Sequence, residues 1–113
     1  MTDKVVILVT AANQEESRKI ARRLVEARLA ACVNILPTVE SVYRWQGQIA
    51  EEGECQLIIK SGKALYAEIE TEILRLHSYR TPEIICLPII EGSRDYLQWI
   101  SESVKPAVAE ESG

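Results

Sequence analysis

The sequence contains no phenylalanine, and only one histidine and one methionine occur among its 113 residues. It also lacks an uninterrupted apolar run of the roughly 18 residues that a membrane-spanning helix requires. The segment from Met1 to Lys4 leads directly into an apolar run, without the basic region and small-residue cleavage site of a secretion signal. We therefore expect a cytoplasmic protein with no membrane partner.

The chain has only three cysteines, and their spacing indicates no disulfide or metal site. Cys32, Cys55 and Cys86 are far apart and odd in number, and they form no CxxC pair. This spacing supports neither a disulfide framework nor a zinc site. Each cysteine is predicted to be a small buried hydrophobic side chain.

The overall composition suits one domain. Hydrophobic residues make up 47% of the chain, enough for a core without disulfide or metal staples. We expect a single domain over residues 1–106 that needs no cofactor to fold, followed by a frayed tail over 107–113. Acidic residues outnumber basic ones by 17 to 13. This balance argues against nucleic acid as a partner, because such binding depends on a positive surface.

The apolar pattern of the first third predicts a strand, a helix and a second strand. The β-branched run 4–10 predicts a strand buried on both faces. Asn13 is expected to cap an amphipathic helix over 14–29, with Glu16 completing a capping box and Val25 on the apolar stripe. Residues 31–36 predict the next strand, which Pro37 should end because proline cannot donate to a central ladder.

The remaining elements follow in the same way. Residues 39–60 predict one long hairpin, with turns at Gly47 and at 51–53. Ser61 is expected to cap a second long helix, and the apolar segment 83–90 predicts the last strand. A short helix that Pro106 stops then closes the domain.

This order is the βαββαβ arrangement of a ferredoxin-like α+β sandwich with an extra C-terminal helix. Both long helices should cover one face of an antiparallel sheet. The apolar strand residues cannot all point at the helices: Ile7, Val9, Val33, Ile35, Ile58, Ile85 and Leu87. An uncovered apolar sheet face usually marks an interface, so we expect a homo-oligomer.

Five sequence blocks point to a known family. They are LAACVNI at 29–35, SVYRWQGQI at 41–49, LIIK at 57–60, HSYRTPEII at 77–85 and GSRDYLQW at 92–99. Together they resemble the signatures of the CutA divalent-cation-tolerance family over about residues 5–103. The resemblance implies a tight homotrimer in which the long hairpins pair between subunits, and a role in tolerance of divalent metals, especially copper. It implies no catalytic activity.

His77 is the one candidate metal ligand. It is predicted at the end of the second helix or just after it, where an imidazole could bind Cu²⁺ or another divalent cation. A helix C-terminus also favours histidine without any metal. The resemblance associates ligation with a cysteine and a second histidine, but Val9 and Leu76 occupy those positions here. Ser78 replaces the family's usual proline, which should loosen the loop.

A second group of side chains predicts a ligand cleft between subunits. Its candidates are Tyr43, Trp45, Lys60, Tyr79 and Glu83. Aromatic residues on a hairpin with a few polar groups are typical of a small-ligand site. In the alternative interpretation the aromatic residues are interface anchors, and Lys60 and Glu83 form a structural ion pair.

Three functional readings remain. The first is a trimeric metal-response protein that binds a cation or small ligand at the inter-subunit cleft. The second is a signalling or scaffold trimer without a metal site, resembling the signal transducers of nitrogen metabolism, whose hairpin contacts an unknown protein. The third, an acylphosphatase-like enzyme, is disfavoured because the loop at 11–14 offers neither glycine nor arginine to hold an anion. We therefore expect no enzyme activity.

Overall fold

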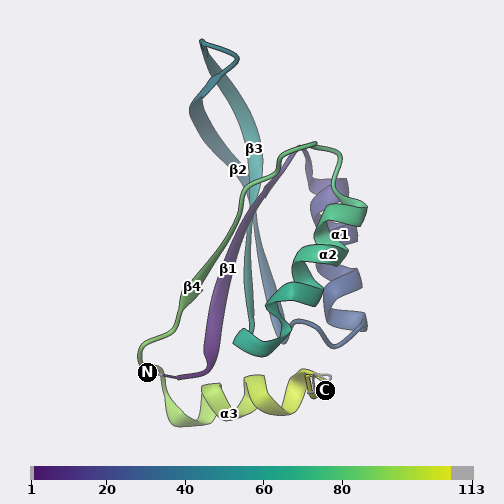
Figure 1. Cartoon of the computed structure of the whole chain (residues 1–113), viewed down its shortest axis with the longest axis vertical. Helices are drawn as coiled ribbons and strands as arrows, with labels where there is room; N and C mark the ends of the chain where they lie inside the picture. The colour runs from purple at the N-terminus through teal and green to yellow at the C-terminus, as the bar shows by residue number, and fades with distance from the viewer. Residues whose placement is uncertain (1, 108–113) are drawn as a thin grey trace, which may run out of the picture.

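Four strands form one antiparallel sheet in the spatial order β2–β3–β1–β4 (Figure 1). The computed structural model describes residues 2–107, so the tail expected over 107–113 lies, apart from Ala107, outside the described residues. The strands are β1 Lys4–Ala11, β2 Cys32–Trp45, β3 Gln48–Gly62 and β4 Ile84–Pro88. Within 2–107 the helices are α1 Gln14–Glu26, α2 Tyr66–Leu76 and α3 Arg94–Ser103, with a 3-10 turn at Lys63–Leu65 before α2. The predicted order of elements is confirmed, and the fold is a mixed α+β fold.

Helix α1 begins where the sequence indicates but ends earlier. The Asn13 side chain accepts a hydrogen bond from the Glu16 backbone at 2.8 Å, which confirms the cap. The helix ends at Glu26 because Arg28 adopts a left-handed conformation with φ of 58°. Val25, expected on the buried stripe, is 43% exposed, so that prediction is wrong.

Strand β2 continues through Pro37, contrary to the expected break. Its pairing with β3 shifts register between Leu36 and Val39, and Pro37 lies in that irregular interval. Because β2 is also an edge strand, the missing N–H of proline removes no bond to a second neighbour.

Strand β3 is also uninterrupted, so the turn expected at 51–53 does not exist. Glu51, Glu52 and Gly53 each pair with a residue of β2. Only Gln46 and Gly47 turn the chain, with φ of 49° and 77°, which is the two-residue hairpin geometry. Residues 51–53 are polar because both sides of the hairpin face solvent there, and they do not bend the chain.

Ser61 belongs to β3 and does not cap a helix. Its hydroxyl donates to the Leu29 carbonyl at 2.6 Å in the interior. Helical structure starts after Gly62 with the 3-10 turn, and no side chain caps it. The last strand is shorter than the expected 83–90, since pairing with β1 stops at Pro88.

Helices α1 and α2 lie on one side of the sheet, and α3 runs beneath its lower end (Figure 1). The hydrophobic core fills the space between those two helices and the sheet. Its buried residues include Val5, Ile7, Val9, Ile20, Leu24, Leu57, Ile59, Leu65, Ile69 and Ile73. None of the helices within 2–107 has the length and apolar character needed to cross a bilayer.

The opposite side of the sheet, here called the open face, carries the alternate residues of each strand. Ile85 and Leu87 of β4 lie there and are 46% and 44% exposed. Val6 and Leu8 of β1 are only partly buried, so within one chain β1 is not buried on both faces as expected. Ile58 of β3 is paired with Leu8 on the same face.

On the helix layer, Glu72 joins two arginines. Its carboxylate accepts from Arg23 Nε at 2.8 Å and also pairs with Arg75. The hydrogen bond from Arg75, and then that from Arg23, lowers the pKa of Glu72 from 4.5 to about 2.

A Glu72→Gln variant tests this pairing through pH. Because the folded pKa lies below the unfolded one, the carboxylate stabilises the fold fully above pH 4.5 and loses that effect as the pH falls towards 2. Thermal unfolding followed by circular dichroism should show wild type above the variant at neutral pH, with the gap closing between pH 4.5 and 2. A gap that is unchanged across that range contradicts the pairing.

Candidate functional site

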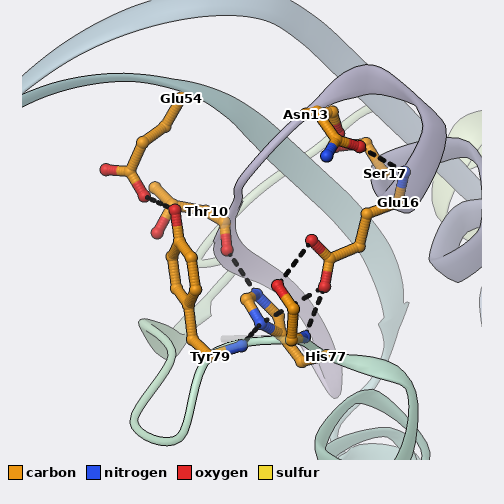
Figure 2. Close-up of polar contacts among 8 residues, drawn as sticks. Thr10, Asn13, Glu16, Ser17, Glu54, His77 and Tyr79 are labelled. Atoms are coloured by element: carbon orange, nitrogen blue, oxygen red, sulfur yellow. Dashed lines mark hydrogen bonds and ion pairs between the residues drawn. The ribbon is translucent and has the colours of Figure 1, made fainter.

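His77 lies at the C-terminus of α2 with its imidazole fully enclosed. The side chain is 0% exposed. Nε2 lies 2.6 Å from the Thr10 carbonyl oxygen, which can only accept, so Nε2 carries the proton. Nδ1 accepts from the Tyr79 backbone N–H at 3.0 Å (Figure 2). The ring is therefore a neutral imidazole with both nitrogens already bonded.

This geometry does not fit a metal held by one chain. A cation at His77 would have to displace the Tyr79 or the Thr10 bond, and tight Cu or Zn binding needs three or four ligands. Among residues 2–107, no three or more His, Cys, Asp or Glu side chains gather as a metal site would require. Residues 2–107 of a single chain therefore do not make a resident metal centre.

Glu16 ties helix α1 to the residue after His77. Its carboxylate accepts from both the backbone N–H and the hydroxyl of Ser78, the latter at 2.9 Å. Glu16 Oε1 also lies 3.6 Å from His77 Nδ1. Proline at position 78 would have no N–H to donate. The loop that was expected to be looser is thus held by two hydrogen bonds.

Tyr79 connects His77 to the hairpin. Its hydroxyl donates to Glu54 Oε2 at 2.9 Å, and its ring centroid lies 4.8 Å from that of His77 (Figure 2). Burial, and then the bond to Glu54, raises the pKa of Tyr79, so the phenol keeps its proton and donates. Glu54 itself is 7% exposed.

Tyr43 and Glu52 adjoin this pair. Burial, and next the neighbouring Glu52 side chain, raises the pKa of Tyr43. Tyr43 and Glu52, on the hairpin, also raise the pKa of Tyr79 electrostatically, so a second phenol and a second carboxylate lie near the Tyr79–Glu54 contact. These four residues, Tyr43, Glu52, Glu54 and Tyr79, are called the oxygen cluster below.

The other predicted cleft residues lie elsewhere in the chain. Trp45 is at the hairpin tip and 54% exposed. Lys60 is on the open face and bonds Asn34, while Glu83 is exposed just before β4. No Lys60–Glu83 ion pair occurs within one chain among residues 2–107, and a pair between subunits stays a prediction. Within one chain only Tyr43 and Tyr79 come together.

Sequence reasoning missed three carboxylates: Glu16, Glu52 and Glu54. The alternation of Glu52 and Glu54 on one strand was a signal for a shared face. Glu16 was noticed only as a capping residue, and nothing local shows that its carboxylate reaches Ser78, 62 positions away.

The serine, histidine and carboxylate near this site do not form a nucleophilic triad. Such a triad needs the imidazole to accept the serine proton. Here the Ser78 hydroxyl donates to Glu16, and His77 Nε2 faces a backbone carbonyl. The geometry supports binding and positioning.

The arrangement therefore defines an α+β protein with helices on one sheet face, a projecting hairpin and a polar network at its base. The chain belongs to the CutA1 divalent ion tolerance family. A profile described as "CutA1 divalent ion tolerance protein" matches residues 5–103.

Individual relatives agree with that assignment. The divalent-cation tolerance protein CutA of Thermus thermophilus is 46% identical over 98 residues, covering 87% of this chain and 95% of the relative. A solved CutA of Xylella fastidiosa superposes with a TM-score of 0.89 at 38% identity, covering 92% of this chain and 100% of that one. A solved CutA of Archaeoglobus fulgidus, described as periplasmic, gives 0.88 at 40% identity, covering 90% and 99%.

Glu16→Ala tests the tie between α1 and the loop after His77. Loss of two hydrogen bonds to a half-buried carboxylate should lower the free energy of unfolding by about 1–2 kcal/mol in urea titrations. Glu15→Ala is the matched control in the same first helical turn, and should change it by less than about 0.5 kcal/mol. Equal effects of the two substitutions would show that only the helix dipole is involved.

Proposed function

We propose that this protein acts in tolerance of divalent cations, copper included, as a cytoplasmic homotrimer of ferredoxin-like subunits that binds a cation or small ligand between subunits. The observation that carries the proposal is the one-sided sheet with its projecting hairpin. Family membership supports the tolerance role, and three free cysteines suit a reducing compartment. The family description names tolerance and no reaction, so no catalytic step is proposed.

The open face supports assembly. Ile85 and Leu87 expose apolar area beside the half-buried Val6 and Leu8. The hairpin adds Val42 at 65% and Ile49 at 70% exposed. Covering this exposed apolar surface with another subunit would lower the free energy of the system. The number three comes from the resemblance to CutA sequences, in which hairpins pair between subunits.

The oxygen cluster is the part of the chain best suited to a cation. Carboxylate oxygens attract divalent ions, and Glu52 and Glu54 supply negative charge on the hairpin. Residues 2–107 of one chain bring together too few ligands for tight binding. Donors from a neighbouring subunit would complete the site, which is why the proposal places it between subunits.

The alternative is a signalling or scaffold trimer with no intrinsic metal site. Two observations favour it: no group of three ligating side chains lies within residues 2–107, and the hairpin tip exposes Trp45 and Ile49. Exposed aromatic and aliphatic side chains at a tip are typical of contacts with another protein.

Calorimetric titration with Cu(II) and Zn(II) separates the two functions. If the cluster binds the cation, wild type should bind and Glu54→Gln should bind at least about tenfold more weakly, since a charged ligand is lost. The matched control is Glu70→Gln, because Glu70 also accepts from a tyrosine hydroxyl, that of Tyr66 at 2.8 Å. Absence of binding to wild type would reject the cation site and leave the scaffold function.

A further inference from the structure

The far half of the hairpin projects from the sheet with no third strand beside it (Figure 1). Strand β3 pairs with β1 only from Cys55 to Gly62, whereas its pairing with β2 continues to the tip. Within residues 2–107 of one chain, residues 39–45 and 48–54, here called the ribbon, are therefore two strands that pair only with each other. A two-stranded ribbon is marginally stable alone. Before a neighbouring subunit pairs with it, the contacts at its base determine its direction.

The contact at the base comes from the loop that joins α2 to β4. Tyr79 in that loop donates its hydroxyl to Glu54, the ribbon residue next to the sheet. Glu54 is nine-tenths buried although it is a carboxylate. A buried carboxylate is costly without a hydrogen-bond donor, so Glu54 favours the position in which it accepts from the Tyr79 hydroxyl.

Tyr79 is itself fixed through His77. Its backbone N–H donates to Nδ1 at 3.0 Å, and its ring packs on the imidazole. The imidazole is held in turn by the Thr10 carbonyl at 2.6 Å, and Thr10 is paired with Gln56 in the sheet. A continuous polar link therefore runs from the sheet through His77 and Tyr79 to Glu54 (Figure 2).

We propose that this polar link (Thr10, His77, Tyr79 and Glu54) sets the direction of the ribbon relative to the sheet, and that His77 is a positioning residue and not a metal ligand. The chain's only histidine is used because one neutral ring can donate on one side and accept on the other. The inference depends on contacts within one chain and applies to the protein without a bound cation, because a cation on Glu54 would compete with the hydrogen bond from Tyr79.

The decisive variant is Tyr79→Phe, which keeps the ring and removes only the donor to Glu54. Amide hydrogen exchange of the full-length protein should become about tenfold faster or more across 39–54, because the ribbon base opens when the buried carboxylate loses its partner. Exchange across 4–11 and 55–62 should stay unchanged. Tyr66→Phe is the matched control, since it removes the same kind of hydroxyl from Glu70 on α2.

Two His77 variants test the positioning role. His77→Ala should loosen the ribbon as Tyr79→Phe does. His77→Asn places an acceptor near the position of Nδ1 and should restore much of the wild-type protection. A ribbon that exchanges at the wild-type rate in Tyr79→Phe overturns the proposal, and so does uniform acceleration of all amides. Loss of Cu(II) binding in His77→Ala with normal ribbon protection would also overturn it, in favour of a ligand role.

Discussion

The register of β3 is the constraint on which the rest of the structure depends. This one strand pairs with β2 from Gln48 to Lys60 and with β1 from Cys55 to Gly62. Its alternation sends Cys55, Leu57 and Ile59 towards the helices and leaves Ile58 and Lys60 on the open face. A slip by one residue would exchange the two faces. It would also move Glu54 away from Tyr79 and disconnect the ribbon.

The same strand explains why one chain looks incomplete. Two helices bury one face of the sheet, and α3 lies below its end, so the open face keeps aliphatic residues in contact with water. The ribbon likewise exposes apolar residues on a segment that nothing within residues 2–107 covers. The polar link at its base fixes a projecting arm, and a fixed arm loses less entropy when it meets a partner.

Much of this architecture is predictable from sequence, because apolar periodicity directly records which face a residue buries. The element order, the Asn13 cap and the tight turn at Gly47 all follow from local rules. The predictions at Pro37 and at 51–53 were wrong for the same reason. Residues that often form turns were expected to end a strand, but an exposed edge of a sheet tolerates them within one. Ser61 misled because a buried hydroxyl can bond a distant carbonyl instead of a helix end.

The candidate site was predictable only in part. The position of His77 at a helix end follows from the stripe of α2, but its partner Thr10 is 67 positions away and no local pattern reveals that contact. Lys60 and Glu83 do not pair within one chain because they lie far apart along the sheet, with Lys60 level with Val6 and Glu83 beyond Ile84, which pairs with Val9. Residue type indicated which side chains were polar, and only the fold determined which of them meet.

The central claim is that the open face and the ribbon are surfaces for further copies of this chain. Sedimentation equilibrium of the full-length protein tests it most directly. Across a wide dilution range, the account predicts a single species of three times the 12.7 kDa chain mass. A mass of one chain throughout that range would contradict it.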